Sequence, residues 1–479
     1  MSAPVGAVSV PRRSDSPALE LWAAGALGAI GVAAALVAAP VALVVTLVVA
    51  AVAAVFIAAF AQPRWLIVLE LALVIGYVPI VLSERVGIPI SHQTVVLLLV
   101  FSLAARRLIG AERHTLPRET VLLAALVVAS VASLGLAYDR ARAGVELVEL
   151  IEVALFAVVA VMLIDDARWL RRALWSVVGA AGILGALATF QQFAGLHDYE
   201  FFGFSDVEQG DRLLARSEGP IDPNFFGQTM VAGAALALYV GLVSRRLAVR
   251  ALAFSASLAC LGGVYFSHSR GALLAVVVAG AVVAVLRRVP IWIPVAGAAA
   301  LAAVVFMVLP AEARERLLDV VRPGQSGIAH ASDESVAGRF AENLAAAAMY
   351  RDHPLVGVGP GNYAAVYHDY AQAVGLDEAA QEGVDRAAHN LFLEALAELG
   401  TVGGLAFLAV VAAAFLGAWR ARVRLPGRDA LLGEGVLVAL TGFFTASLFL
   451  HSAYQHYLWL MIALGLAAGR IARRTAVGA

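Results

Sequence analysis

Three polar motifs interrupt an otherwise apolar sequence, and each holds a side chain suited to chemistry. The first is His389-Asn390, followed after nine residues by Gly400-Thr401-Val402-Gly403. A neutral imidazole can accept a proton near physiological pH, so His389 is a candidate general base. Asn390 can cap the helix that follows, and the two glycines permit close helix packing. A histidine at such a boundary is also found simply as an interfacial polar residue, and Glu394 and Glu398 either orient His389 or are solvated.

The second motif is the polar turn Ser267-His268-Ser269-Arg270-Gly271 between two apolar segments. A guanidinium group beside hydroxyls and turn amides suits a phosphate group, which makes Arg270 and Ser269 candidate anion-binding residues. The alternative is a plain hairpin whose Arg270 extends to the lipid headgroups.

The third motif covers residues 211–224 and contains Arg212, Arg216 and Asn224. Asp222 and Pro223 have a structural explanation, as the N-cap and the first residue of a helix. Arg216 has no such explanation. A lone arginine in this setting is either solvated, bound to lipid phosphate, or part of a site.

The elements that position these motifs follow from composition. The chain has 479 residues, of which 61% are hydrophobic and 14% charged, whereas soluble domains average roughly 45–50% apolar and about 25% charged residues. Continuous apolar runs of membrane-spanning length predict helices rather than a barrel. The sequence therefore predicts an all-α, polytopic transmembrane helix bundle of about 12–14 spans. The predicted spans lie near 20–38, 40–60, 65–83, 93–108, 119–137, 146–164, 172–194, 224–243, 247–266, 272–286, 290–309, 396–418, 430–449 and 452–470.

Charge placement predicts the sidedness of the bundle. Every basic residue except histidine is arginine, and the arginines concentrate in alternate loops. By the positive-inside rule those loops, and both termini, are cytoplasmic in a multi-pass protein of the inner or cytoplasmic membrane. The short loops of the opposite face contain six arginines: Arg85, Arg140, Arg142, Arg212, Arg216 and Arg270. The last three lie in the motifs above.

One loop is long, and under this topology it is extracytoplasmic. The predicted organisation is a cytoplasmic tail (1–19), an N-terminal transmembrane bundle (20–309), the long loop (310–388), C-terminal transmembrane helices (389–470) and a cytoplasmic tail (471–479). Within the loop, helical spacing predicts short helices over Glu312–Val321 and Gly338–Tyr350, lying on the bundle or at the membrane interface. The second helix places Phe340, Leu344 and Ala347 on one face. The glycines of residues 354–363 serve either loop geometry or binding.

Together and in this order, the motifs resemble the O-antigen ligase and O-antigen polymerase family. His389-Asn390 with its nine-residue gap to Gly400-x-x-Gly403 matches the family signature, as do the long loop before it, Arg216, and Ser269-Arg270-Gly271. The resemblance implies a membrane glycosyltransferase of cell-envelope polysaccharide biosynthesis, with an undecaprenyl pyrophosphate-type donor, a lipid or glycan acceptor and no cofactor.

On that basis His389 is expected to deprotonate the acceptor hydroxyl, with inversion at the anomeric carbon. Arg216 and Arg270 would stabilise the leaving pyrophosphate, with Arg212 as a weaker third clamp, because fixed guanidinium groups stabilise developing negative charge. Ser269, Asn390 and Asn224 complete the predicted substrate contacts.

Other functions stay open at this point. A polymerase of the same family uses the same donor type. A transporter or flippase is the main alternative class, since Glu70, Glu146, Glu149 and Glu152 lie in apolar segments, yet no internal repeat relates two halves. A scaffold would not explain the three motifs. The scattered histidines predict no metal site, although Asp198 and Glu200 are outward and leave divalent-cation binding open. A net charge of -1 gives no reason to expect nucleic acid as a partner.

Overall fold

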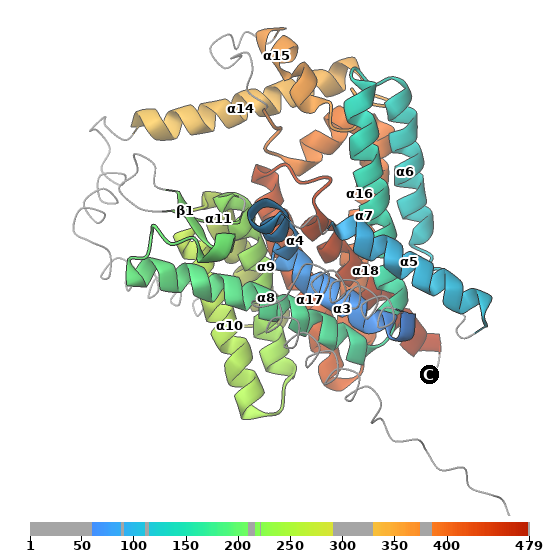
Figure 1. The fold of residues 1–479 in the computed structure, drawn as a ribbon, viewed down its shortest axis with the longest axis vertical. Helices are drawn as coiled ribbons and strands as arrows, with labels where there is room; N and C mark the ends of the chain where they lie inside the picture. The colour runs from blue at the N-terminus through green and yellow to red at the C-terminus, as the bar shows by residue number, and fades with distance from the viewer. Residues whose placement is uncertain are drawn as a thin grey trace, which may run out of the picture. The chain divides into compact units, whose positions relative to one another are not determined.

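The computed structural model describes residues 60–87, 91–110, 115–208, 216–220, 222–290, 329–373 and 386–477. Helices dominate these segments (Figure 1). The N-terminal half holds α3 (Pro63–Ile75), α4 (Val78–Val81), the π-helix η1 (Leu82–Val86), α5 (His92–Leu108), α6 (Thr120–Gly135), α7 (Arg140–Leu163), α8 (Ala167–Ala194), η2 (Phe201–Gly203), β1 (Asp206–Glu208) and β2 (Arg216–Gly219). The remainder holds α9 (Pro223–Val243), α10 (Leu247–Phe266), α11 (Arg270–Arg287), α14 (Ala329–Asp352), α15 (Tyr363–Ala373), α16 (Leu391–Arg424), η3 (Gly427–Asp429), α17 (Ala430–Ala446), η4 (Ser447–Phe449) and α18 (His456–Val477).

Aspartate side chains define where several long helices begin. Asp139, Asp166 and Asp222 cap α7, α8 and α9, each accepting hydrogen bonds from two backbone N–H groups of the first turn. These N–H groups have no partner within the helix, so a capping carboxylate stabilises each helix start. Pro223 occupies the first turn of α9, as the sequence predicts.

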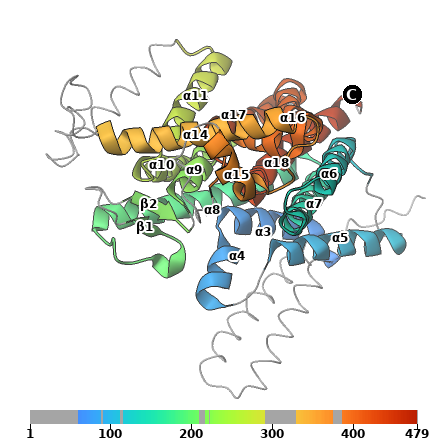
Figure 2. The same cartoon turned by 90° about the horizontal axis from the view of Figure 1, so that it is seen from above.

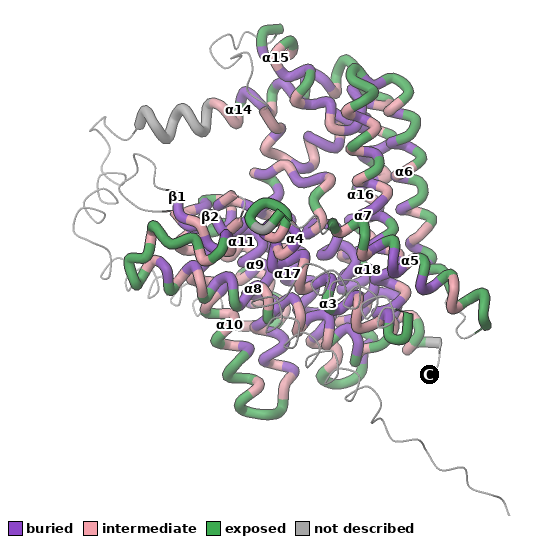
Figure 3. The backbone as a smooth tube through the Cα atoms, in the orientation of Figure 1, coloured by how far each residue is buried: buried purple, intermediate pink, exposed green. Residues whose placement is uncertain are grey.

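The centre of the bundle is built on α9 and α17. Almost every residue of α9 is buried, including its glycines and Phe226, Met230 and Tyr239. It packs against α8, α10 and α17, while α16 packs against α17, α18 and α6. Figure 3 shows the buried residues concentrated along these central helices. Because α9 is apolar all round, other helices can enclose it on every side.

The peripheral helices leave apolar side chains exposed. Leu258 on α10 is 69% exposed and Val277 on α11 is 63% exposed. Exposed aliphatic side chains along long helices suit contact with lipid. By length and composition, six helices in the described residues can cross a membrane, or seven if α3 and the bent helix that follows it (Val78–Arg85) count as one span. The prediction of an all-α, polytopic membrane protein is therefore confirmed.

The predicted spans that fall on described residues each coincide with helical structure, and one of them is bent. Spans 20–38, 40–60 (apart from residue 60) and 290–309 (apart from residue 290) lie outside the described residues. The predicted span 65–83 is α3 followed by α4 and η1, bent by 67°. Tyr77 adopts a left-handed conformation at the bend, and Pro79 follows at the start of α4. A proline and a left-handed residue interrupt the helical hydrogen bonds, which a hydropathy pattern does not register.

Part of the long loop forms α14 and α15, which lie at one end of the bundle (Figures 1 and 2). The expected helix over 338–350 exists as the second half of α14. The face carrying Phe340 and Leu344 is exposed, however, and Ala341, Ala345 and Met349 form the buried face. Small side chains let α14 approach α16 closely, whereas the larger apolar ones face away. The expected helix Glu312–Val321 lies outside the described residues.

Candidate active site

A break in α16 shapes the site. Gly400 has φ 62° and ψ −164°, so the helix changes course there. The segment that follows α14 crosses this break. Thr401 and Val402 donate backbone hydrogen bonds to the carbonyls of Pro354 (2.7 Å) and Leu355 (3.2 Å). The freed carbonyls of α16 are also satisfied, because the amide of Val358 donates to Ala397 and that of Gly359 donates to Glu398.

The sequence predicts that Gly400 permits close packing between helices, and the structure gives it another role. A Cβ atom at Gly400 would lie 2.4 Å from the carbonyl carbon of Leu355 and the nitrogen of Val356. The close approach is therefore between α16 and an extended loop. The glycine-rich stretch 354–363 is thus part of the packed framework beside the site, and Asn362 ties it to the turn before α7 by bonding with Asp139.

Glu394 and Glu398 hold backbone groups in place. The Glu398 carboxylate accepts hydrogen bonds from the amides of Gly361 (2.9 Å) and Tyr363 (3.2 Å) and from the Tyr454 hydroxyl (2.7 Å). The Glu394 carboxylate accepts from the amide of Ser452 at 3.0 Å. Both side chains are buried. The interpretation of these residues as solvated is wrong, and no hydrogen bond between either of them and His389 appears among the described residues.

His389 lies directly before α16, in a left-handed conformation with φ 43°. Its Nε2 lies 3.8 Å from Glu342 Oε2 on α14. Its ring meets that of His451 edge to face, with ring centres 5.5 Å apart. Burial, with the positive charges of His451 and Arg339 as further causes, lowers the pKa of His389 to about 4. The imidazole is therefore neutral at pH 7 and can accept a proton.

Glu342 is the carboxylate nearest to His389. It is buried, and Arg386 Nη1 lies 3.3 Å from its Oε1. Burial raises the pKa of Glu342 to about 7, against the opposing charges of Arg386 and Arg339. Near neutral pH this carboxyl group can therefore hold or release a proton beside the imidazole.

A cavity of about 470 Å³ opens beside His389. It is lined by Glu342, Arg386, His451 and Ser452, together with the carboxylates of α7 and α16 and the arginine Arg142. Several buried polar atoms on its wall have no hydrogen-bond partner among the described residues: His389 Nδ1, His451 Nδ1, Glu342 Oε2, Arg386 Nε and Ser452 Oγ. Buried polar groups are normally paired, so a wall of unpaired donors and acceptors suits a ligand rich in hydroxyl groups.

Arg216 joins the second and third sequence motifs. Its Nε donates to the carbonyl of Ser267 at 2.8 Å, and its Nη2 donates to Asn224 Oδ1 at 3.0 Å. The turn also packs tightly on α9, since a Cβ atom at Gly227 would lie 2.7 Å from Ser267 Oγ. The start of β2, the start of α9 and the turn between α10 and α11 therefore meet at one point.

Residues at the start of α9 connect this junction to the cavity. The ring of Phe225 contacts that of His451, with centres 5.2 Å apart. The Asp222 carboxylate lies close enough to raise the pKa values of His389 and His451 against the lowering effect of burial. His389 and Arg216 thus occupy the same end of the bundle and are linked through the first turn of one buried helix, α9.

The other described residues that the sequence predicts for the site do not line the cavity beside His389. Arg270 is the first residue of α11 and is exposed, and no ion pair of its side chain occurs among the described residues. Ser269 and Asn390 are N-caps, with Asn390 Oδ1 accepting from the amides of Phe392 and Leu393. Arg212 lies outside the described residues. Glu200, one of the two acidic residues that the sequence predicts to be outward, is paired with Arg85 at 2.7 Å.

The four glutamates in apolar segments, which leave a transporter open as an alternative, divide into two groups. Glu70 bonds His92 at 2.7 Å, and Glu152 bonds His456 at 3.0 Å. Glu146 and Glu149 line the cavity beside His389. These acidic residues therefore have local partners or belong to the cavity.

Sequence reasoning missed Glu342, Arg386 and His451 as site residues. Glu342 belongs to a helix whose larger apolar residues suggest a different buried face. His451 offers one signal in the sequence, because it directly precedes the last apolar segment at the same predicted membrane face as His389.

Part of the chain is similar to a known protein family. A family model described as O-antigen ligase matches residues 255–408, from within α10 to within α16. No curated protein matches the chain. Among solved structures, a chain described under "Structural coordination of polymerization and crosslinking by a peptidoglycan synthase complex" is 20% identical, with a TM-score of 0.40, covering 74% of this chain and 97% of that chain. The matched segment contains the Ser267–Gly271 turn, His389 and the break at Gly400. Residues 255–408 of this multi-pass membrane protein therefore match the O-antigen ligase family, which confirms the resemblance found in the sequence.

Proposed function

We propose that this protein transfers a glycan from a polyprenyl pyrophosphate donor to an acceptor hydroxyl held in the cavity beside His389. The main observation in support is that the neutral, half-buried imidazole of His389 faces a cavity whose wall has several unpaired polar atoms. The match to the O-antigen ligase family supplies the class of reaction. The active site would lie on the extracytoplasmic face, and no metal is required by this scheme.

In this scheme His389 accepts the proton of the acceptor hydroxyl. The acceptor oxygen then forms a bond to the anomeric carbon while the bond from that carbon to the pyrophosphate oxygen breaks, so the configuration inverts. The pyrophosphate leaves with the bonding electrons, and the proton remains on His389. A general base contributes roughly 10²–10⁴-fold to such a step.

Charge suggests where each substrate would bind. The cavity wall carries more carboxylates than arginines, so it suits a neutral glycan acceptor better than a pyrophosphate. The cationic groups Arg216 and Arg270 lie at and beside the turn between α10 and α11. There they would stabilise the charge that accumulates on the leaving group. Arg212, Asn224, Ser269 and Asn390 are further proposed contacts.

The central test is His389→Ala in proteoliposomes that contain a polyprenyl pyrophosphate-linked glycan and an acceptor. We expect loss of product, because no other base faces the acceptor hydroxyl in this scheme. His353→Ala is the matched control, since His353 is an exposed histidine at the end of α14. Wild-type turnover of a well-folded His389→Ala protein would refute the proposal.

The same assay separates transfer from transport. A labelled donor moved by a flippase would keep its glycan on the pyrophosphate, whereas transfer attaches the label to the acceptor. Arg270→Lys tests whether Arg270 binds the leaving pyrophosphate, because Lys keeps the charge but not the bidentate geometry. Arg270 is preferred to Arg216 here, since changing Arg216 would also disturb its bonds to Ser267 and Asn224.

A ligase and a polymerase use the same kind of donor and differ in the acceptor. The glycan-length profile of a deletion strain distinguishes them. Loss of long chains with short units still attached indicates a polymerase, and loss of all attached glycan indicates a ligase.

A further inference from the structure

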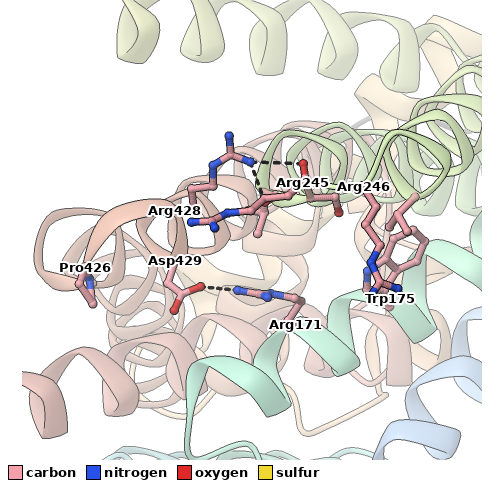
Figure 4. A pocket seen from close by; sticks show the side chains of 10 residues that line it. Arg171, Trp175, Arg245, Arg246, Pro426, Arg428 and Asp429 are labelled. Carbon is pink, nitrogen blue, oxygen red and sulfur yellow. Dashed lines mark hydrogen bonds and ion pairs between the residues drawn. The ribbon is translucent and has the colours of Figure 1, made fainter.

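A second cavity lies at the opposite end of the bundle from His389. It has a volume of about 530 Å³ and is formed where the first turns of α8, the turn between α9 and α10, and the turn between α16 and α17 meet (Figure 4). α9 has 21 residues and extends from the Arg216 junction to this cavity. At 1.5 Å per residue, the two sites are separated by roughly 30 Å along the helix, which is about the thickness of the hydrocarbon core of a membrane.

Four arginines and one aspartate line this cavity, and two of the arginines are held in place. Arg428 Nη1 donates to the carbonyls of Val243 and Ser244, both at 3.3 Å, at the end of α9. Arg171 pairs with Asp429. These bonds, drawn in Figure 4, fix two guanidinium groups at the cavity wall without an extra ligand.

The other two arginines, Arg245 and Arg246, are adjacent in the turn between α9 and α10. Both are exposed and both line the cavity. Within the part of the chain that the structure describes, neither side chain has an ion pair or hydrogen bond to a protein group. Two like charges without a counter-charge, beside two more arginines, create a strongly positive site that favours an anion.

The start of α10 adds backbone donors to the same cavity. Arg246 is the N-cap residue of α10, and no side chain caps this helix end. Val249, in the first turn, also lines the cavity. The N–H groups of an uncapped first turn and the positive end of the helix dipole both favour a phosphate group. Trp175 on the wall suits the interfacial region of a bilayer.

We infer that this cavity binds a phosphate group, carried either by an anionic membrane lipid or by a free phosphate ion. A guanidinium fork matches phosphate oxygens in a bidentate manner, and exposed basic pockets among membrane helices suit anionic headgroups. The inference does not depend on the glycan-transfer proposal, because no residue of this cavity belongs to the site beside His389.

The experiment uses the full-length protein in nanodiscs of neutral phosphatidylcholine. In one arm a small fraction of phosphatidylglycerol is added, and its retention by the protein is measured by native mass spectrometry. In the other arm inorganic phosphate replaces chloride at equal ionic strength, and the thermal unfolding midpoint is followed. The variant is Arg245→Gln with Arg246→Gln, and the matched control is Arg168→Gln with Arg424→Gln. The control pair consists of exposed arginines outside the cavity and changes the net charge equally.

We expect the cavity variant to weaken phosphatidylglycerol retention roughly tenfold or more if the ligand is a lipid, since each basic group near the surface contributes to headgroup affinity. If the ligand is a free phosphate, the phosphate-induced rise in the unfolding midpoint is lost instead. The control pair should resemble the wild type in both arms. Equal behaviour of the two double variants in both arms would overturn the inference. Arg245→Gln alone, with a smaller loss, provides a second variant should the double change reduce protein yield.

Discussion

The break in α16 makes a quantitative prediction for Gly400→Ala. At φ 62° and ψ −164°, Gly400 occupies a region that residues with a side chain rarely adopt. Such strain costs about 1–3 kcal/mol. The added methyl group would also lie 2.4 Å from backbone atoms of Leu355 and Val356. Because those atoms belong to the backbone, they cannot swing aside, and overpacking of this kind costs about 1–3 kcal/mol.

Together the two effects predict a loss of roughly 2–6 kcal/mol if the fold does not adjust. If it adjusts, the segment after α14 moves out of the break, and the backbone bonds from Thr401 and Val402 to that segment are lost. Glu398 would then lose its bonds to Gly361 and Tyr363, which shape the cavity. Activity should therefore fall even in protein that remains folded.

The assay measures the thermal unfolding midpoint and the rate of glycan transfer on the same preparation. Gly280→Ala is the matched control, because a Cβ atom at Gly280 on α11 has no neighbour within 4 Å. The control should unfold at or slightly above the wild-type temperature, since alanine favours helix formation. If Gly400→Ala matched the control in both measurements, the loop would not depend on the break in the way proposed.

Three further predictions concern charge. Because the pKa of His389 is lowered to about 4, the acid limb of kcat/KM should lie well below pH 6.5, and Arg339→Gln should move it upward by removing a positive charge that lowers this pKa; a limb that stays near pH 6.5 in both proteins would contradict the assignment. Glu398→Gln leaves one oxygen to accept three hydrogen bonds, so unfolding experiments should show a loss of about 1–3 kcal/mol. Asp222→Ala removes the cap of α9 and should cost about 1 kcal/mol in the same measurement, whereas Asp222→Asn should retain most of the stability.

The helices were predictable because a span of this length must be apolar whatever it packs against. The aspartate cap and proline that start α9 were predictable for a similar reason, since helix ends are specified by local residues. The bend at Tyr77 was not, because hydropathy does not change across it. The sequence places Phe340, Leu344 and Ala347 on one face of α14 but leaves open whether that face meets the bundle. The structure shows that alanines face α16, while Phe340 and Leu344 face away.

The site residues also divide into those that could be predicted from the sequence and those that could not. His389 and Arg216 were identified because polar residues stand out against apolar spans, and the structure places both at one end of the bundle. Glu342 could not be identified, because its pairing with His389 depends on how α14 crosses α16. Glu398 gave a misleading signal. A glutamate near a helix start is normally solvated, yet this one is buried among backbone donors that come from a distant loop.

Within the His-Asn and Gly-x-x-Gly pattern, the proposed base is one residue, and two others position it. Asn390 caps the first turn of α16, and Gly400 allows the helix to open around the segment that follows α14. Both roles are architectural. They hold His389 between α14 and the loop before α18, where burial keeps its imidazole neutral. The spacing between histidine and glycine therefore corresponds to the short helical stretch that must fit between the proposed base and the loop that builds the cavity wall.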